Sequence, residues 1–334
     1  MQNIASRVTT LVTGANGFIG SHLVEALLSG DHHVRCLVRR TSDLKRLSGL
    51  DIELVYGSLG DVESLKLAAK DCDFIYHLAG AVKAKDQQDF YRHNTEGAIN
   101  IAKAALETSP GLKRFLFSSS QAAAGPSACL NRPVCEGTEC RPLSDYGKSK
   151  QRAEKKLSEL SDKLPLTIIR PPSVYGPRDT EVFLYFQWIN RGLALLPGIK
   201  TRYAHLIYVK DLVSGMIRAA ESEHTKGKTY FLAEERAYSW QEISDLIAQS
   251  LGKKPVKLHI PLFLAHFSAV LSEAGAFAAD KPTQFTRQKV QEMSQRYWTV
   301  SADAARQDFG FQCRYDLERG IEETAQWYKA NMWL

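Results

Sequence analysis

The first half of the chain alternates short runs of β-branched and aliphatic residues with longer stretches in which apolar residues recur every three or four positions. Runs of the first kind are typical of buried strands, and stretches of the second kind are typical of helices that cover a sheet. The predicted strands are Val8–Thr13, Val34–Val38, Ile52–Tyr56, Phe74–Leu78, Arg114–Ser118 and Leu166–Arg170. The helices predicted between them are Ser21–Ser29, Ser42–Ser48, Val62–Ala69, Asn94–Glu107 and Tyr146–Leu160. This alternation predicts an α/β fold with a doubly wound parallel sheet.

The alternation ends after Pro171, where short apolar pieces are separated by loops rich in proline and glycine. A strand His205–Val209 and a helix Asp211–Ala220 are predicted to return to the first part. A chain of 334 residues is long enough for roughly two domains. We therefore expect a first domain of residues 1–170 with 205–233 returning to it, and a smaller second part made of 171–204 and 234–334.

Composition narrows the function classes. Hydrophobic residues make up 44% of the chain and charged residues 24%, which are ordinary globular values and exclude a mainly disordered or fibrous protein. The charge balance is 43 − 37 = +6, and it is spread along the chain without a basic block. Nucleic acid is therefore not an expected partner.

The cysteines and the apolar stretches indicate in which cellular compartment the protein is expected. The six cysteines form no CxxC pair, and no histidine lies within the cluster Cys129, Cys135 and Cys140, so we expect reduced thiols, no metal site and a cytoplasmic protein. The N-terminus has no signal-peptide core. The stretch Leu258–Ala279 is apolar but interrupted by Pro261 and polar residues, which favours an amphipathic surface or lid helix over a membrane span. A membrane partner is not expected.

Glycines mark the end of the first strand. Gly14, Gly17 and Gly20, in the segment TGANGFIG, stand between a predicted strand and a predicted helix. A dinucleotide-binding fold needs glycines there, for a tight turn, for close approach of the backbone to a pyrophosphate and for an open helix N-terminus that attracts an anion. The position of the triplet at the start of a βαβ array predicts a Rossmann-like domain that binds NAD or NADP.

The end of the second strand bears on the choice between those cofactors. An enzyme specific for NAD commonly carries an acidic residue about 20 positions beyond the glycines, where it accepts a hydrogen bond from the ribose. Here the segment reads LVRRTSD, with Arg39 and Arg40. A guanidinium pairs with a 2′-phosphate, so Arg39 favours NADP, with NAD as the alternative. A solvated surface loop is the other interpretation of these two arginines.

Candidate catalytic groups follow the fifth strand. Tyr146 and Lys150 are spaced i, i+4 in SDYGKSK, so a helix places them on one face, where an ammonium is expected to lower the pKa of the phenol. Ser120, at the end of FLFSSS, would donate a hydrogen bond to a carbonyl or alkoxide oxygen beside Tyr146. A tyrosine and a lysine at this spacing also occur on helix surfaces that have no catalytic role.

Together these segments resemble the extended short-chain dehydrogenase/reductase family, which includes sugar-nucleotide epimerases and dehydratases, dihydroflavonol reductases and 3β-hydroxysteroid dehydrogenases. The resemblance extends through HLAG at His77, HNTEG around Asn94, YGKSK, RPPSVYGPRD from Arg170 and YVKDLV from Tyr208, and so covers nearly the whole chain. It implies a Rossmann-like sheet domain, a C-terminal substrate-binding part and a homodimer.

The resemblance also implies roles for individual residues. Tyr146 corresponds to the acid/base, Lys150 to its partner that also holds the nicotinamide ribose, and Ser120 to the group that polarises the substrate oxygen. Asn94 corresponds to a structural residue that bends a helix. The remaining cofactor contacts that the resemblance implies are Phe18 and Ile19 at the pyrophosphate, Ser58 and Leu59 at the adenine, Leu78, Ala79 and Gly80 at the ribose, and Pro171 and Val174 at the nicotinamide. Ser58 stands where the family carries an aspartate, which puts the adenine contact in question.

Two departures from the family pattern favour one branch. Gln121 follows Ser120 where dehydratases carry an acidic residue, and the arginine with which sugar-nucleotide enzymes hold a diphosphate is missing at Ala204, with Arg202 slightly displaced. The predicted function is NADP-dependent hydride transfer to or from a carbonyl or alcohol of a small apolar or mixed substrate. Sugar-nucleotide epimerisation is the alternative, and a regulator that keeps the fold without turnover is a third hypothesis.

Overall fold

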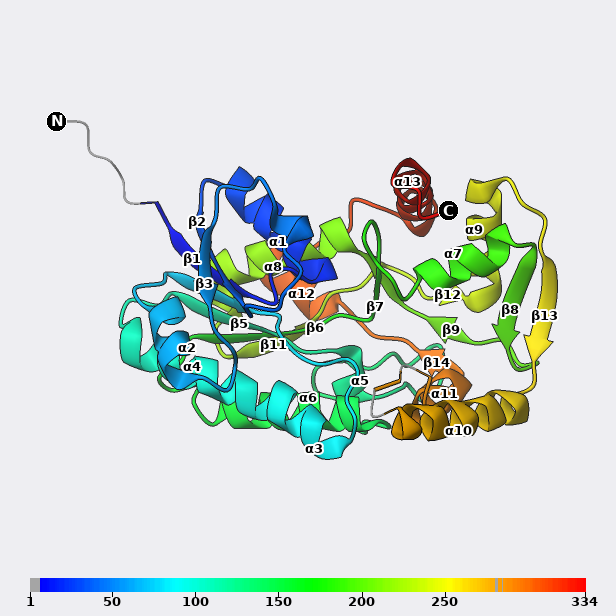
Figure 1. The fold of residues 1–334 in the computed structure, drawn as a ribbon, viewed down its shortest axis with the longest axis horizontal. Helices are drawn as coiled ribbons and strands as arrows, with labels where there is room; N and C mark the ends of the chain where they lie inside the picture. Colours follow the sequence, from blue (N-terminus) through cyan, green and yellow to red (C-terminus); the bar gives the residue numbers. More distant parts are fainter. Residues whose placement is uncertain (1–6, 280–281, 284) are drawn as a thin grey trace.

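The computed structural model describes residues 7–279, 282–283 and 285–334. Its centre is a seven-stranded parallel sheet with the strand order β11-β6-β5-β4-β1-β2-β3 (Figure 1). The strands are β1 (Thr9–Thr13), β2 (His33–Val38), β3 (Glu53–Tyr56), β4 (Phe74–His77), β5 (Arg114–Ser118), β6 (Leu166–Arg170) and β11 (Lys228–Phe231). The predicted α/β fold and all six predicted strands of the first half are confirmed, with small differences at their ends.

Helices cover both faces of this sheet (Figure 1). Each strand alternates its side chains between two apolar layers: Leu11 and Ile75 face one cluster, whereas Val12 and Tyr76 face the other. The first cluster lies under α2 (Val62–Ala69), α4 (Gly97–Thr108) and α6 (Asp145–Ser158). The second lies under α1 (Phe18–Ser29), α8 (Val209–Glu221) and α12 (Asp303–Phe309). Residues near the C-terminus thus complete the core of the sheet.

Two helices predicted in the first half differ from the structure. The predicted helix Ser42–Ser48 is wrong, because only a 3-10 turn, Lys45–Leu47, forms before Gly49 adopts a φ of 79°. Leu47 is nevertheless buried. The predicted helix that begins at Asn94 is preceded by α3 (Gln87–Phe90) and widens into a π-helical turn, Tyr91–Glu96, before α4 begins.

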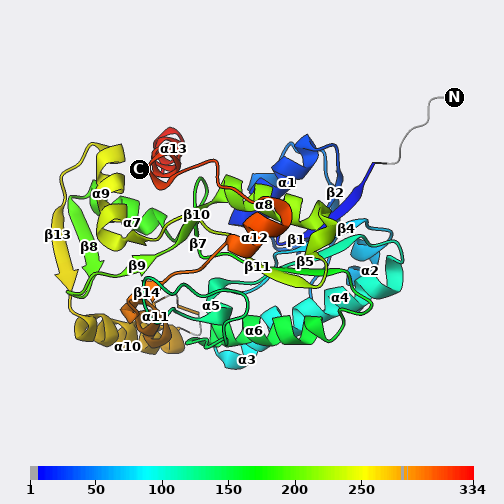
Figure 2. The ribbon, with the colours of Figure 1, turned by 180° about the vertical axis from the view of Figure 1, so that it is seen from behind.

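Most of the remaining chain forms smaller sheets and helices beside the carboxyl ends of the strands (Figure 2). We call this part of the structure the second layer. Its strands are β7 (Ser173–Tyr175), β8 (Leu193–Pro197), β9 (Tyr203–Ala204), β10 (Leu206–Tyr208), β12 (Tyr238–Ser239), β13 (Val256–Ile260) and β14 (Tyr297–Trp298). Its helices are α5 (Gln121–Ala124), α7 (Phe183–Asn190), α9 (Trp240–Leu251), α10 (Leu262–Ala278), α11 (Arg287–Ser294) and α13 (Leu317–Ala330). A 3-10 turn, Glu223–Thr225, lies instead at the amino edge of the main sheet, before β11. The predicted strand at His205 is β10, which pairs with β7 outside the main sheet.

The stretch Leu258–Ala279, for which the sequence predicts one amphipathic helix, is divided at Pro261. Its first residues complete β13, which pairs in parallel with β8, and α10 starts directly after the proline. Proline is well suited to the start of a helix and poorly suited to the interior of a strand pair, which explains the division. The helix itself lies along the outer edge of the molecule (Figures 1 and 2).

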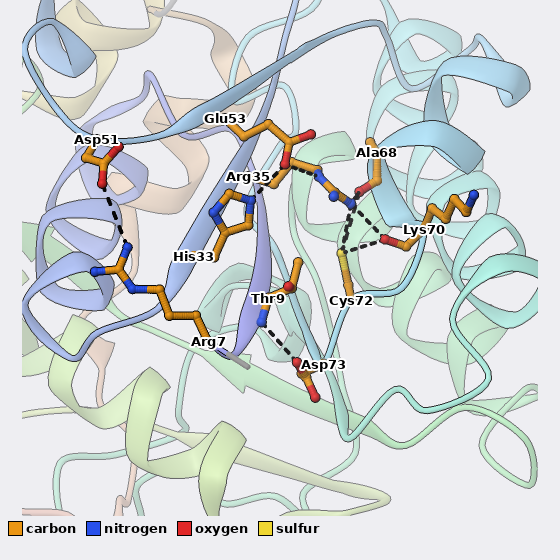
Figure 3. Close-up of polar contacts among 10 residues, drawn as sticks. All are labelled: Arg7, Thr9, His33, Arg35, Asp51, Glu53, Ala68, Lys70, Cys72 and Asp73. Atoms are coloured by element: carbon orange, nitrogen blue, oxygen red, sulfur yellow. Dashed lines mark hydrogen bonds and ion pairs between the residues drawn. The ribbon is translucent and has the colours of Figure 1, made fainter. Parts of the chain in front are cut away.

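Polar side chains close the amino ends of the strands (Figure 3). Arg35 donates to the carbonyl oxygens of Ala68 and Lys70, both at 2.8 Å, and pairs with Glu53 at 2.9 Å. The carboxylate of Asp73 accepts from the backbone N–H of Thr9 at 2.9 Å. These contacts occupy the amino edge of the sheet, so the space for ligands lies at the opposite, carboxyl edge.

Candidate active site

The glycine turn after β1 is shaped for an anion. Gly14 has a φ of 72°, and a Cβ on Gly20 would lie 2.1 Å from the carbonyl oxygen of Gly14, so neither position tolerates a side chain. Helix α1 begins after Gly17 with no side-chain cap and no acidic residue in its first turn. Its free N–H groups and the positive end of its dipole therefore suit a pyrophosphate.

A buried pair orients the loop after β4. Thr13 Oγ1 lies 2.7 Å from His77 Nδ1, and burial lowers the pKa of His77 to about 3, so the imidazole is neutral. The same threonine oxygen accepts from the backbone N–H of Ala79 at 3.2 Å. This arrangement holds Leu78 and Ala79 against Gly14, where an added Cβ would lie 2.8 Å from Ala79 N.

Asn94 holds the continuation of that loop. Its amide oxygen accepts from the N–H of Ala81 at 2.7 Å, and its amide nitrogen donates to Ala81 O and to Ser149 Oγ, both at 2.9 Å. The residue lies in the π-helical turn and joins the loop after β4 to α6. Asn94 thus has a structural role, because it holds the loop after β4 against α6, the helix that carries Tyr146 and Lys150.

Ser120 and Tyr146 come from two adjacent helix starts. Ser120 is the N-cap of α5, where its Oγ accepts from the N–H of Ala122 at 3.1 Å. Ser144 caps α6 in the same way and accepts from the N–H of Gly147, which places Tyr146 in the first turn of that helix. Gly147 packs so tightly on the carbonyl of Ala122 that a Cβ would lie 2.4 Å from it. The close contact of the two helices brings the two hydroxyl groups together.

The phenol of Tyr146 is held in its protonated form. Burial raises the pKa of Tyr146 to about 12, a hydrogen bond with Ser120 lowers it, and the carboxylate of Glu292 raises it further. The pairing with Lys150 predicts a lowered pKa. The direction is the opposite, because desolvation of the buried phenol outweighs the hydrogen bond with Ser120.

Lys150 is buried one turn further along α6. Its Nζ donates to the carbonyl oxygen of Ser118 at 2.8 Å and lies 4.8 Å from the centre of the Phe117 ring. Burial lowers the pKa of Lys150 from 10.5 to about 8, and Glu154 opposes this shift. Lys150 is thus an ammonium whose charge is only partly compensated, and a Cβ on Gly80 would lie 3.4 Å from its Nζ.

A buried ion pair lies behind Lys150, and it is absent from the sequence-based predictions. Glu154 binds Arg170 through two contacts, of 2.9 and 2.6 Å, and also accepts a short hydrogen bond from Ser119. It therefore joins α6 to the ends of β5 and β6. The signal in the sequence is the i, i+4, i+8 series of Tyr146, Lys150 and Glu154 on one helix face.

Ser120, Tyr146 and Lys150 open into one cavity of about 1760 Å³. Its walls include the predicted residues Gly14, Gly17, Phe18, Ile19, Gly20, Leu78, Gly80, Ser120, Tyr146, Lys150, Pro171 and Val174. Arg39, Ser58, Leu59 and Ala79 are not among the residues that line it. One continuous space thus runs from the glycine turn to Tyr146.

The remaining predicted residues lie beside this space. Arg39 follows β2 directly, is exposed, and belongs to a loop that is joined to the glycine turn through a hydrogen bond from Asn16 to the carbonyl of Asp43 at 3.3 Å. Arg40 instead lies over the ring of Tyr56 at 5.5 Å. Leu59 packs against Gly97 at the start of α4, and Ser58 directly precedes it.

The other half of the cavity is mainly apolar. It is lined by aromatic and aliphatic side chains of the second layer, among them Tyr185, Trp188, Leu195, Leu206, Trp240, Ile243, Leu262 and Phe285. Helix α11 closes it against α6: Glu292 accepts from Ser144 Oγ at 2.5 Å, and Gln288 exchanges two hydrogen bonds with Asp145. No local pattern indicates this contact, because its partners are more than 140 positions apart.

Arg202 does not face the cavity. Its side chain is 6% exposed, and its guanidinium donates to the carbonyl oxygens of Pro197, Lys200 and Ser294. Ala204, on the same short strand as Tyr203, does line the cavity. The guanidinium is therefore engaged by the backbone and unavailable to a ligand.

The described residues hold no metal-binding cluster and no membrane-spanning helix. No group of three or more histidine, cysteine, aspartate or glutamate residues in that part of the chain is arranged to hold a metal ion. Among the described helices, none combines the length and the apolar character needed to cross a membrane. All six cysteines are free thiols.

Known proteins resemble this chain in sequence and in fold. The sequence model of the NAD dependent epimerase/dehydratase family matches residues 10–233. A ceramide reductase of Caulobacter vibrioides is 30% identical over 98% of this chain and 97% of its own, and a UDP-glucose 4-epimerase of Vibrio cholerae is 28% identical over 76% and 79%. The crystal structure of gox2253 superposes with a TM-score of 0.81 at 27% identity and covers 97% of this chain and 98% of its own.

The family model spans well over half of the chain, and the ceramide reductase spans nearly all of it. The chain is therefore a member of the NAD dependent epimerase/dehydratase family and an NAD(P)-dependent enzyme of the extended short-chain dehydrogenase/reductase type.

Proposed function

We propose that this enzyme is an NADP-dependent oxidoreductase that reduces a carbonyl, or oxidises the corresponding alcohol, on an apolar substrate. The observation that carries the proposal is the convergence of Ser120, Tyr146 and Lys150 in one cavity, between the glycine turn and a mainly apolar wall. We further assign cofactor binding to residues 1–170 with 205–233, and substrate binding mainly to 171–204 and 234–334.

The residues supply positioning and a proton. The first turn of α1 would hold the pyrophosphate and Lys150 the nicotinamide ribose; the cofactor, when bound, supplies or accepts the hydride. Tyr146 is protonated at neutral pH, because a phenol ordinarily titrates near pH 10 and burial raises the pKa of this one further, to about 12. Its hydroxyl therefore carries a proton that it can donate to the substrate oxygen. Ser120 donates a second hydrogen bond to that oxygen and orients it.

The apolar wall supports an apolar substrate. Bulky side chains such as Trp188, Trp240 and Phe285 line the substrate half, whereas Arg202 is occupied by three carbonyl oxygens and cannot grip a diphosphate. The resemblance to a ceramide reductase, whose name indicates a lipid substrate, agrees with this assignment. The resemblance to a UDP-glucose 4-epimerase keeps epimerisation of a sugar nucleotide as the alternative.

The preference for NADP rests on Arg39. It is exposed directly after the carboxyl end of β2, the strand that pairs with β1, after which the glycine turn follows. A guanidinium there would pair with a 2′-phosphate, and neither Arg39 nor Arg40 offers an acceptor for the ribose hydroxyl of NAD. A cytoplasmic location and a homodimer stay predictions from the sequence and the resemblance.

The experiment that tests this proposal compares two substrate classes. Protein purified without added cofactor is incubated with NADPH and either a long-chain 3-oxo compound or UDP-glucose. We expect NADPH oxidation with the ketone, no change in UDP-glucose, and little cofactor bound to the purified protein, because a dehydrogenase exchanges its cofactor in every cycle. Stoichiometric NAD in the purified protein together with epimerised UDP-glucose would establish the alternative.

A further inference from the structure

Gln121 carries a buried amide that the fold leaves without a partner. The side chain is 4% exposed, and its Nε2 finds no hydrogen-bond acceptor among the described residues. Seven residues in the described part of the chain have such a buried, unpartnered polar atom, and of these Gln121 alone lines the active-site cavity. Buried donors in folded proteins are nearly always paired, so an unpaired one beside a cavity points to a partner that arrives with a ligand.

The surroundings of Gln121 give no structural reason for a polar side chain. Helix α5 consists of Gln121 and three alanines, so Gln121 is the one polar residue of this helix. An unpaired amide there destabilises the fold, because it loses its hydrogen bonds to water on burial and gains none in return. An apolar residue of the same size would fill the space without this cost. The fold therefore does not account for the amide.

The backbone fixes where this amide lies. The N–H of Gln121 donates to the carbonyl oxygen of Pro171 at 2.9 Å, and its own carbonyl oxygen accepts from the N–H of Gly125 at 3.0 Å. Ser120, the preceding residue, is the N-cap of the same helix and lines the same cavity. Consecutive Cα atoms are about 3.8 Å apart, so Ser120 and Gln121 border the cavity as neighbours.

The hydroxyl groups nearby are already engaged. Ser119 donates to Glu154, and Ser144 donates to Glu292 at 2.5 Å. Both serines are buried and line the cavity, but their protons are held by carboxylates. The amide of Gln121 has no such acceptor and is free to donate to a ligand.

The chemistry of the neighbouring pair indicates what it would recognise. Under the proposed function, Ser120 and Tyr146 hold the oxygen of the carbonyl that is reduced. An amide nitrogen only donates hydrogen bonds, so its partner is an acceptor, and a carbonyl oxygen is an acceptor that an apolar substrate can carry without charge. Because Gln121 directly follows Ser120, the two substrate oxygens must lie close together, as they do when a single carbon separates two carbonyl carbons.

We propose that Gln121 determines substrate specificity: its amide nitrogen donates a hydrogen bond to a second carbonyl oxygen of the substrate. The enzyme therefore prefers long-chain 3-oxoacyl compounds, such as esters, to simple ketones. This inference rests on the proposed function, because it takes the oxygen held by Ser120 and Tyr146 as the reacting one.

The test compares two substrates that differ at one end. In methyl 3-oxododecanoate the first carbon is a methyl ester, and in dodecan-3-one it is a methyl group. Their reduction by NADPH is measured for the wild type and for Gln121→Met, which keeps the size of the side chain and removes the amide. We expect the ratio of kcat/KM for the ester to kcat/KM for the ketone to fall roughly tenfold in the variant, because one hydrogen bond is lost. An unchanged ratio, with both compounds reduced, would overturn the inference and leave the proposed function standing.

A matched variant and a stability measurement exclude a merely structural role. Gln187→Met on α7 alters a half-buried glutamine that does not line the cavity, so its ratio should equal that of the wild type. The melting temperature of Gln121→Met should equal or exceed that of the wild type, because its Nε2 donates no hydrogen bond that the substitution could remove. A fall of several degrees in both Gln121→Met and Gln121→Leu would show that the amide supports the fold, which contradicts the inference.

Binding without turnover separates this inference from the proposed function. With NADP⁺ in place of NADPH no reduction takes place, and the Kd of each compound is measured by calorimetry. We expect Gln121→Met to weaken binding of the ester roughly tenfold relative to the ketone, with the Kd of NADP⁺ unchanged. A weaker NADP⁺ complex with unaltered ester binding would mean that the amide contacts the cofactor, against the inference. Binding of the ester that depends on Gln121, without reduction of either compound, would contradict the proposed function and leave the hydrogen bond supported.

Discussion

Lys150 lies in the candidate active site, and burying its positive charge there lowers the free energy of unfolding. Its pKa is lowered from 10.5 to about 8 by burial, so between these pH values the unfolded chain binds more protons than the folded one. The cost of burying the charge is therefore fully present below about pH 8 and is relieved as the pH rises toward 10.5. The full difference corresponds to about 3 kcal/mol at about 1.36 kcal/mol per pKa unit.

We expect Lys150→Met to remove this pH dependence. The free energy of unfolding of the wild type, measured in urea, should rise relative to that of the variant between about pH 8 and 10, because only the wild type loses a buried charge. The lost hydrogen bond to Ser118 shifts the variant by an amount that does not depend on pH. Parallel curves for the two proteins over this range would show that Lys150 is not a buried cation.

Arg39 allows a prediction about cofactor choice. A charge-assisted hydrogen bond to phosphate contributes about 1.5–3 kcal/mol, which is roughly one to two decades of affinity. Arg39→Asp should therefore weaken NADPH binding by about that factor and improve NADH binding, as measured by fluorescence titration. Arg40→Asp is the matched control, because that guanidinium lies over Tyr56. Tighter binding of NADH than of NADPH by the wild type would refute the assignment.

At the scale of elements, α11 connects the apolar part of the cavity wall to α6, the helix that carries Tyr146. Gln288 donates to the carboxylate of Asp145 at 2.7 Å and accepts from its backbone N–H at 2.8 Å, one residue before Tyr146. Two lost hydrogen bonds cost about 1–3 kcal/mol. Gln288→Ala should thus raise KM for the apolar substrate by a factor of roughly 5 to 150, while the Kd of NADPH, measured by titration, stays unchanged.

The control for this prediction is Gln249→Ala on α9, which removes an exposed hydrogen bond to Glu318 outside the cavity. Its KM should equal that of the wild type. An equal increase in KM and in the Kd of NADPH for Gln288→Ala would mean that α11 supports the whole fold rather than the substrate half.

Elements are predictable from the sequence where local pattern decides the structure. The predicted bounds of β5 and β6 match the structure to the residue, because strands buried on both faces read as continuous apolar runs. The glycine turn and the helix spacing of Tyr146 and Lys150 are equally local. The segment Ser42–Ser48 is not predictable in this way, because a single turn is too short for periodicity to distinguish a helix from a loop.

Contacts between distant segments cannot be predicted from local pattern. The pairs Ser144 with Glu292 and Arg170 with Glu154 depend on how whole elements pack. The same holds for Arg202, whose place in the sequence is compatible with a diphosphate contact although three backbone carbonyls occupy it in the fold. The raised pKa of Tyr146 likewise follows from burial, which spacing along a helix does not reveal.

At the scale of the whole molecule, the sheet and the helices on its two faces support a cavity at the carboxyl edge of the sheet. One cavity begins at the α1 N-terminus, passes Tyr146 and ends beside α10. Under the proposed function, this continuous space would hold the cofactor at the glycine turn and an apolar substrate at the other end.

The most direct test of the central claim follows the hydride itself. The wild type and Tyr146→Phe are incubated with NADPH that carries deuterium on the transferred position of its nicotinamide ring and with a long-chain ketone, and the alcohol is analysed by mass spectrometry. We expect deuterium at the carbinol carbon with the wild type, and a rate at least about 100-fold lower with Tyr146→Phe at unchanged NADPH affinity, because the proton donor is lost. Absence of deuterium in the wild-type product, or a variant that keeps more than about a tenth of the rate, would contradict the proposed hydride transfer with Tyr146 as proton donor.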